Sequence, residues 1–165
     1  ANQLLIMDYN RVVKDLNGLE EAAFIDKLGD RFIIEKKESS FRPGQQHEFG
    51  MYINHQWYQL VSKPGSYKED PIGVLDITIL QENILGPILG ITDQRTDKRI
   101  DFIGGIRGLE ELEKRVDNGE AVAFSIYPVS IQQLLEVADS GNVMPPKSTW
   151  FEPKLRDGLL THLVD

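Results

Sequence analysis

The stretch KRIDFIGGIRGLEELEKRVDNGEAVAFSIYP, residues 98–128, alternates between strand and helix patterns. Its first eight residues predict a strand, and Leu109, Leu112 and Val116 then fall on one face of a predicted helix. Residues 120–128 form a nearly continuous apolar run, which is typical of a strand in the centre of a sheet. This β-α-β order usually places two parallel strands side by side.

The flanking sequence predicts further elements of both kinds. Ser130 and Gln133 have the spacing of a capping box at the start of a helix, which we expect to pack through Ile131, Leu134, Leu135 and Ala138. A β-hairpin is expected over residues 47–62, with its turn at Asn54. The other expected elements are strands at 4–13, 31–38 and 155–164 and helices at 19–30 and 72–85. We therefore predict an α+β fold with a mixed, mainly antiparallel sheet, a β-hairpin and one βαβα unit.

The length and the first residues indicate a domain of a larger protein. The 165 residues suffice for one domain with its own core, so residues 1–165 are predicted to be a single domain, with sub-lobes 1–68 and 69–165 as an alternative. The chain starts ANQLLIMDYN, without an initiator Met or a signal peptide. No apolar run approaches the ~18 residues that span a bilayer. We expect a cytoplasmic C-terminal fragment without a membrane segment.

Charge and composition make several functions improbable. The formal net charge is −8, whereas a protein that wraps nucleic acid needs a positive surface, so nucleic-acid binding is not expected. The chain has no cysteine, which excludes disulfides and thiol nucleophiles. His47, His55 and His162 lack metal-ligand spacing, so no metal site is expected.

Two loops that follow the strands of the βαβ unit could bind a ligand. Gly104, Gly105 and Arg107 lie where a strand ends and a helix begins, and free N–H groups there could hold an anion. A tight turn that needs glycine is the simpler alternative. The loop 128–130 would lie at the same edge of the sheet, where ligands of such units gather, although Ser130 is also explained as a helix cap.

Two carboxylates on the predicted helix 72–85 are candidates for a general acid or base. Asp76 and Glu82 lie among apolar residues, and a partly buried carboxylate can have a raised pKa. Each could equally be paired with an arginine or exposed to solvent. The sequence identifies no further catalytic residue.

The segment MPPKSTWFEPKL, residues 144–155, differs in composition from the rest of the chain. Its two consecutive prolines fix an extended backbone, so little entropy is lost in placing the polar residues that follow. Trp150 and Phe151 could form an aromatic floor. The alternative is a strand whose aromatic residues fill the core. The side chains predicted to bind a phosphate or carboxylate group are Lys147, Ser148, Thr149 and Lys154.

This segment, together with DYNRVVKDLNGL (8–19) and RIDFIGGIRGLEELEKRV (99–116), resembles the bacterial domain-of-unknown-function family 1015. Members are often labelled SpoOJ/ParA/ParB/RepB-like and are about two and a half times as long as this chain. The resemblance covers essentially the whole chain and implies a missing N-terminal part with an Asp-Gly-His-His-Arg motif, similar to one in ParB and sulfiredoxin-like domains. That superfamily includes nucleotide-binding proteins and free serine kinases. The family often has His where this chain has Gln81, which weakens a catalytic role at that position.

The resemblance and the residues together support two hypotheses of different classes. In the first, the chain binds a phosphate-bearing, nucleotide or amino-acid ligand within a ParB/sulfiredoxin-like small-molecule phosphotransfer enzyme, with a serine-related enzyme as one case. The fragment alone would then be inactive and would hold no cofactor, whereas the intact protein would bind a nucleotide, and the N-terminal region would be its partner. In the second, the chain is an interaction or homodimerisation domain, with NHQWYQL (54–60) and Trp150-Phe151 as interface. A chromosome-partition DNA binder is a third and weaker hypothesis.

Overall fold

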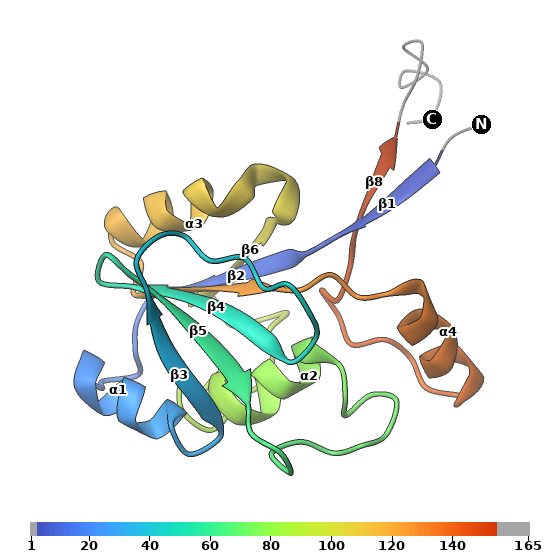
Figure 1. The fold of residues 1–165 in the computed structure, drawn as a ribbon, viewed down its shortest axis with the longest axis horizontal. Helices are drawn as coiled ribbons and strands as arrows, with labels where there is room; N and C mark the ends of the chain where they lie inside the picture. Colours follow the sequence, from blue (N-terminus) through green and yellow to red (C-terminus); the bar gives the residue numbers. More distant parts are fainter. Residues whose placement is uncertain (1–2, 155–165) are drawn as a thin grey trace.

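A computed structural model describes residues 3–154. Its centre is a six-stranded antiparallel sheet with the strand order β3-β5-β4-β7-β2-β6 (Figure 1). The α+β class is confirmed. The two strands of this sheet that come from residues 69–165, β7 and β6, lie on either side of β2, which comes from residues 1–68. The strands are β2 (Tyr9–Val13), β3 (Phe32–Lys37), β4 (Glu48–Ile53), β5 (Gln56–Ser62), β6 (Ile100–Gly104) and β7 (Val122–Ile126).

The βαβ unit consists of β6, α3 (Gly108–Asp117) and β7, but its two strands are not neighbours. Both pair antiparallel with β2, which lies between them. The expectation of two parallel strands side by side was therefore wrong. The unit is a split βαβ, in which a strand from the start of the chain occupies the central position.

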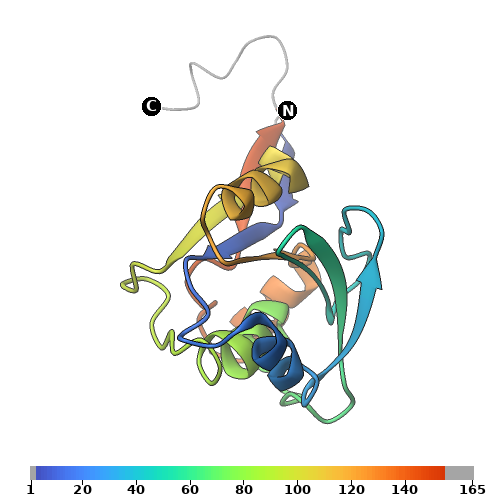
Figure 2. The same ribbon diagram turned by 90° about the vertical axis from the view of Figure 1, so that its left-hand side faces the viewer.

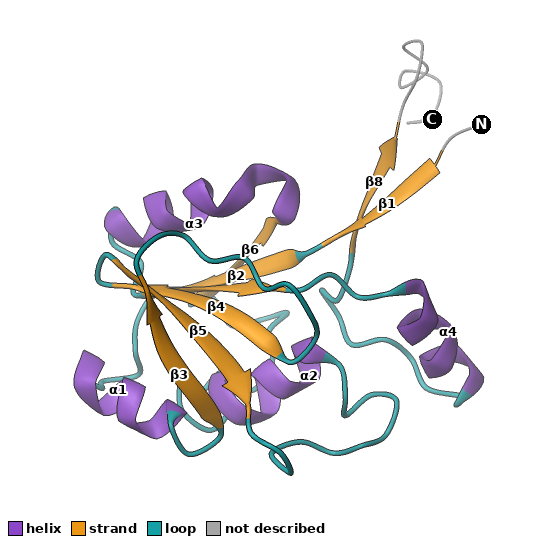
Figure 3. Ribbon diagram, viewed as in Figure 1, coloured by secondary structure: helices purple, strands orange, loops and turns teal. Residues whose placement is uncertain are grey.

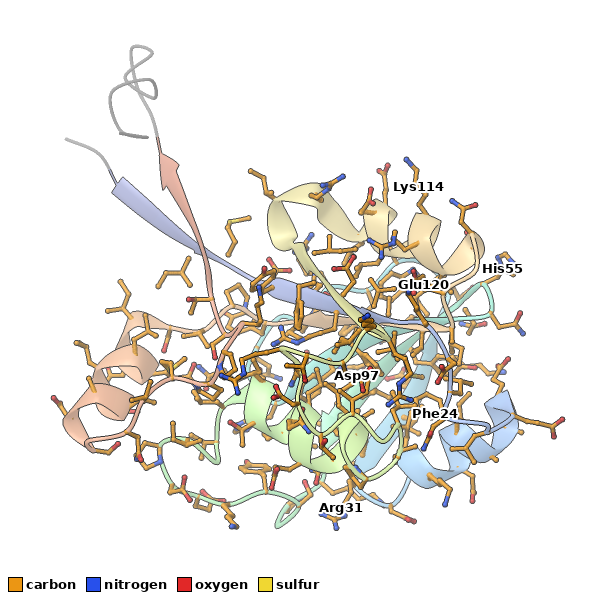
Figure 4. All side chains as sticks on the ribbon, turned by 180° about the vertical axis from the view of Figure 1, so that it is seen from behind. Phe24, Arg31, His55, Asp97, Lys114 and Glu120 are labelled. Atoms are coloured by element: carbon orange, nitrogen blue, oxygen red, sulfur yellow. The ribbon has the colours of Figure 1, made fainter. Side chains whose placement is uncertain are left out.

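Helices cover both faces of the sheet (Figures 2 and 3). On one face α3 packs through Leu112 and Val116, as its sequence pattern predicted. On the other face lie α1 (Glu21–Leu28), which contributes Phe24 (Figure 4), and α2 (Asp76–Leu80), which continues as the π-helix η1 (Gln81–Leu85). The larger of the two cores lies on this second face.

The hairpin β4–β5 turns as its sequence predicted. Asn54 and His55 both have positive φ, 48° and 61°, which is the requirement of a two-residue type I′ turn. Its aromatic residues point into the cores, since Trp57 and Tyr58 are only 4% and 5% exposed. The expectation that this hairpin forms an interface was therefore wrong for these two side chains.

The helix predicted over residues 72–85 begins later than expected. Asp70 does accept hydrogen bonds from the backbone N–H groups of Ile72 and Gly73, at 3.1 and 2.7 Å, but they close a turn. Gly73 lies against the backbone of Lys68, where an added Cβ would be 2.5 Å from the carbonyl oxygen. At this turn the backbone at Gly73 passes close to the backbone at Lys68, and α2 starts only at Asp76.

The helix α4 (Ile131–Asp139) has the predicted capping box, with Gln133 N–H donating to Ser130 Oγ at 3.0 Å and Ser130 N–H donating to Gln133 Oε1 at 3.2 Å. Its packing differs from the prediction. Gln133 and Val137 are buried, whereas Ile131 and Leu135 are 64% and 59% exposed. Val137 packs against Leu75 and Ile77 near the start of α2, and this contact determines which face of α4 turns inward.

The strand predicted over residues 4–13 is interrupted at Asp8. The residues before Asp8 form β1 (Gln3–Met7), which does not belong to the large sheet. It pairs antiparallel with β8 (Trp150–Lys154), and the two strands form a ribbon that projects from the domain (Figures 1 and 2). The last strand predicted, residues 155–164, lies outside the described residues. There is no helix long and apolar enough to cross a membrane in the described part of the chain.

Candidate functional site

The carboxyl ends of β6 and β7 meet at the start of β2. Gly104 of β6 pairs with Tyr9, and β7 runs alongside β2 in the same direction as β6. The segment that links α4 to β8 passes over this point and brings Lys147 and Ser148 to it. Two regions that the sequence analysis considered separately, the strand ends of the βαβ unit and residues 144–149, therefore lie together.

The centre of this site is Arg11, a residue that the sequence analysis did not select. Arg11 points from β2 toward the α2 side of the sheet and is only 1% exposed. Its guanidinium donates hydrogen bonds to Gln94 Oε1 at 3.1 Å, to the carbonyl oxygen of Lys147 at 2.6 Å and to that of Tyr9. All three acceptors are neutral. No described carboxylate forms an ion pair with it.

The Arg11 guanidinium has a lowered pKa because it is buried without a carboxylate partner among the described residues. Desolvation lowers the pKa of Arg11 to about 9, opposed by a smaller electrostatic effect of Tyr9. The side chain nevertheless stays protonated at neutral pH. A buried charge is normally paired, so an unpaired one is energetically costly. A guanidinium carries five N–H donors, and three of them are used here, so two can still donate to an anion.

Lys147 brings a second cation to the same two aromatic rings. Its Nζ lies 5.8 Å from the ring centre of Tyr9 and 5.3 Å from that of Phe102, and the Arg11 guanidinium carbon lies 5.0 Å from the ring centre of Phe102. Phe102 is the cross-strand partner of Arg11 on β6. The backbone of Lys147 has a φ of 60°, a conformation that side chains other than Gly, Asn and Asp seldom adopt. Two cations near one another create a local preference for a negatively charged ligand.

A chain of amides holds Arg11 in place. Gln94, which accepts from Arg11, donates to Gln81 Oε1 at 2.7 Å, and Gln81 donates to the carbonyl oxygen of Ile91 at 2.8 Å. Gln94 and Gln81 also line a cavity of about 510 Å³, together with Pro145 and Pro146. This cavity lies directly beside the segment that carries Lys147, and its volume is in the range of small-molecule sites.

Asp8 adds a carboxylate on the other side of the strand end. It is 3% exposed and accepts a hydrogen bond from Arg42 Nη1 at 3.0 Å. Arg42 belongs to a loop that passes close to β4 at Gly50. A Cβ added to Gly50 would lie 2.6 Å from the carbonyl oxygen of Phe41 in this loop. At Gly105 a Cβ would be 1.7 Å from Asp8 Oδ1. An anion at the Gly104–Gly105 turn would thus lie beside a carboxylate, and the anion site predicted there stays a prediction.

Asp76 and Ser148 line a second, much smaller cavity, together with Asp8 and Arg11. Its volume of about 10 Å³ is room for roughly one water molecule. Asp76 is 5% exposed, and burial raises its pKa to about 7, although the hydrogen bond from the His47 backbone N–H at 2.8 Å opposes this. Its role as an acid or base stays a prediction.

The remaining predicted residues are more scattered. Thr149 is half-buried next to Ser148, whose hydroxyl donates to the Pro145 carbonyl oxygen. Arg107 is exposed and lies 3.9 Å from Glu111 on its own helix. Glu82 lines a third cavity, away from Arg11. The side chains of Trp150, Phe151 and Lys154, and all of His162, lie outside the described residues. The described part of the chain contains no cluster of three or more His, Cys, Asp and Glu residues arranged to hold a metal ion.

Comparison with known proteins gives a partial family match. The model of the DUF1015 family, proteins of unknown function, matches residues 1–78, which supports the resemblance for that part of the chain. No curated protein matches the sequence.

Solved structures match over more of the chain. A conserved hypothetical protein from Pyrococcus furiosus is 14% identical, with a TM-score of 0.55 over 90% of this chain and 56% of that chain. A mutant free serine kinase in complex with AMP is 10% identical, with a TM-score of 0.54 over 90% of this chain and 54% of that chain. At such identities the likeness shows the fold alone. This chain spans little more than half the length of either protein.

Proposed function

We propose that this chain binds the phosphate group of a small-molecule ligand, such as a nucleotide, as part of a phosphotransfer enzyme. Arg11 and Lys147 hold the phosphate, Thr149 supplies a hydroxyl donor, and the Ser148 hydroxyl becomes a second donor when it turns away from the Pro145 carbonyl oxygen. The buried and unpaired guanidinium of Arg11 is the observation that carries this proposal. The likeness of the fold to a free serine kinase that was solved with AMP supports the ligand class.

The ligand body occupies the cavity of about 510 Å³ beside Pro145 and Pro146. Gln94 separates this cavity from the Arg11 guanidinium, because its side-chain oxygen accepts from Arg11 Nε and the residue also lines the cavity. A phosphate oxygen that replaces the Gln94 oxygen exchanges a neutral acceptor for a charged one. Charge-assisted hydrogen bonds of this kind are roughly twice as strong as neutral ones.

The proposal assigns binding to this chain and the chemical step largely to the rest of a longer protein. The ParB/sulfiredoxin-like relationship, the C-terminal position within that protein and the serine-related substrate are parts of this proposal. Asp76 is the one buried carboxylate near the site whose pKa of about 7 suits a proton transfer at neutral pH. The chain by itself is expected to bind ligand without catalysing transfer.

Calorimetric titration tests the site. Inorganic phosphate, AMP and ADP are titrated into the chain and into the Arg11→Met and Lys147→Ala variants. Binding also stabilises the folded chain: a ligand present at about a hundred times its Kd raises the free energy of unfolding by about 2.7 kcal/mol. Loss of one charge-assisted contact is expected to weaken binding by about tenfold or more.

Lys114→Ala is the matched control, because Lys114 is an exposed lysine on α3, on the opposite face of the sheet (Figure 4). The proposal requires that this control binds as the parent chain does while Lys147→Ala does not. Equal binding by both lysine variants, or no binding of any of the three ligands by the parent chain, contradicts it.

One observation favours a second function, that of an interaction domain. The apolar residues Ile131 and Leu135 of α4 are exposed instead of packed, and Val143 shortly after the helix is 86% exposed. Large exposed apolar groups that lie close together are typical of interaction surfaces. If the chain is a homodimer through α4, Leu135→Glu will convert it to a monomer in analytical ultracentrifugation. A parent chain that is monomeric at every concentration excludes this function.

A further inference from the structure

A further cavity of about 660 Å³ is lined in part by residues of α2 and η1, and neither Arg11 nor Lys147 lines it. It is formed by the loop between β5 and α2, by the first residues before β3 and by the side of α2 and η1. Figure 4 shows Arg31 at this edge of the molecule, near that loop. Its lining shares no residue with the small cavity of Asp76 and Arg11.

Four charged side chains line this cavity, two of each sign: Arg31, Lys68, Asp70 and Glu82. None of the four forms an ion pair with a described residue. The other surface arginines all have a carboxylate partner within 3.9 Å, namely Arg42, Arg95, Arg99, Arg107 and Arg115. The charges around this cavity therefore remain available to a ligand, although opposite charges lie nearby.

The floor of the cavity is a buried polar arrangement. Asn83 is 5% exposed, accepts from Arg31 Nη1 at 3.1 Å and donates to the Ser66 carbonyl oxygen at 3.0 Å, so it fixes both the cation and the loop. Thr78 also lines the cavity, and its buried hydroxyl has no hydrogen-bond partner. Buried hydroxyls are nearly always satisfied, so this one, which is unpaired as well as shielded from solvent, meets a ligand when the side chain turns toward the cavity.

The backbone that presents Glu82 and Asn83 is unusual. Both belong to the π-helix η1, which follows directly from α2. A π-helical segment is rare and is less stable than an α-helix, and such segments are found frequently at functional sites. The wider turn changes the direction of the side chains relative to an uninterrupted α-helix, and here it places a carboxylate and a buried amide on the same cavity wall.

We infer that this cavity binds a small zwitterion of the α-amino acid class. Arg31 and Lys68 bind its carboxylate, Glu82 binds its ammonium group, and Thr78 donates or accepts one further hydrogen bond. A guanidinium suits a carboxylate because its N–H donors match the two oxygens. The inference does not depend on phosphate binding at Arg11, because Arg31, Lys68 and Glu82 line neither of the two cavities beside Arg11, although Ile72 and Thr78 line both this cavity and the one of about 510 Å³.

The test uses the twenty common amino acids at millimolar concentration in a thermal-shift screen of the whole chain. The amino acid with the largest shift is then titrated calorimetrically beside two analogues, its N-acetyl derivative and its amide. These analogues lack the positive and the negative charge respectively. The zwitterion is expected to bind at least about tenfold more tightly than either analogue.

Two isosteric or near-isosteric variants match the analogues. Glu82→Gln is expected to weaken binding of the zwitterion about tenfold. Binding of the N-acetyl derivative should not change, because that derivative has no ammonium group for Glu82 to bind. Thr78→Val is expected to weaken the binding of all three ligands, the zwitterion and its two analogues. The control is Glu110→Gln, an exposed glutamate on α3 that does not line the cavity, and it should bind as the parent chain does.

Failure of this inference is distinguishable from failure of the phosphate site. Arg11→Met, which removes the phosphate site, should leave amino-acid binding unchanged. The inference is overturned if no amino acid shifts the unfolding transition, if the two analogues bind as tightly as the zwitterion, or if Glu82→Gln and Glu110→Gln bind equally well.

Discussion

Arg11 lies in the middle of β2 and Arg99 lies just before β6, the strand that pairs with β2, yet the surroundings of the two arginines are opposite in character. Arg99 directly precedes β6, and its carbonyl oxygen accepts from Lys14 N–H, just beyond the end of β2. Its side chain is 28% exposed, binds Asp97 through two nitrogens at 3.0 and 3.2 Å and lies 3.3 Å from Asp15. Arg11 is only 1% exposed, and its guanidinium donates only to neutral oxygens.

This difference shows where the chain tolerates electrostatic cost. The hydrogen bond to Asp97 raises the pKa of Arg99, whereas burial lowers the pKa of Arg11. A carboxylate partner would contribute more at the buried position than at the exposed one, because water screens the exposed pair. The chain nevertheless pairs the exposed arginine. Strain of this kind is characteristic of binding sites, where a ligand relieves it.

The largest effect is expected at Asp76, the second buried charge without an ion-pair partner in this region. Its pKa is raised from 3.8 to about 7, so the folded state binds the proton more tightly than the unfolded state. Stability from this group is therefore complete below the unfolded pKa and is lost as the pH rises to about 7. Asp76→Asn should remove this pH-dependent loss of folding stability, whose upper limit is on the order of 4 kcal/mol. Denaturant unfolding across this pH range measures it.

Asp97→Asn is the control of opposite sign. The hydrogen bond from Arg99 lowers the pKa of Asp97, so its contribution is present above the unfolded pKa and is lost as the pH falls. The two variants should thus diverge as the pH rises: Asp76→Asn becomes more stable than the parent chain and Asp97→Asn less stable. The hydrogen bond from the His47 backbone N–H opposes the effect of burial on Asp76, whereas Glu48 adds to it, and parallel curves for the two variants would show that the His47 hydrogen bond outweighs burial.

The second effect concerns Arg11 itself. Arg11→Met leaves three oxygens without a donor but also removes an unpaired buried charge. These two consequences oppose each other, so we expect the free energy of unfolding to change by less than about 2 kcal/mol. Removing one member of a true buried ion pair costs about 3–5 kcal/mol. A loss of that size, measured by denaturant titration without phosphate, would mean that the hydrogen bonds of Arg11 to its three neutral acceptors outweigh its unpaired charge and that its role is structural.

The local patterns in the sequence predicted most elements of the fold, for reasons that are local themselves. The capping box at Ser130 and the turn at Asn54 depend on residues within four positions of each other. The orientation of α4 could not be predicted in this way. The periodicity shows that the helix has an apolar face, but Val137 is buried because it meets Leu75 and Ile77, which are distant in sequence.

The site was predictable only in part for the same reason. Lys147 and Ser148 stood out by composition, and the structure brings them to the strand ends. Arg11 was missed, although an arginine inside an apolar strand is a visible signal. Its contacts with Gln94 and Lys147 span 83 and 136 positions, and nothing in the sequence places these three residues together. A charged residue in a strand with buried neighbours is therefore worth selecting before its partners are known.

The smallest effect is expected at Arg99. Arg99→Gln removes its contacts with Asp97 and Asp15, but these are exposed pairs, so we expect a loss of less than about 1 kcal/mol. The loss should shrink further at about 1 M salt, where charges are screened beyond roughly 3 Å. The effect of Arg11→Met should not depend on salt in this way, because its surroundings exclude water. Unfolding curves for both variants at low and high salt measure the contrast. If the cost of Arg99→Gln does not fall at high salt, or if that of Arg11→Met falls by as much, exposure does not determine how these two arginines respond to salt, and the contrast between the paired and the unpaired arginine is wrong.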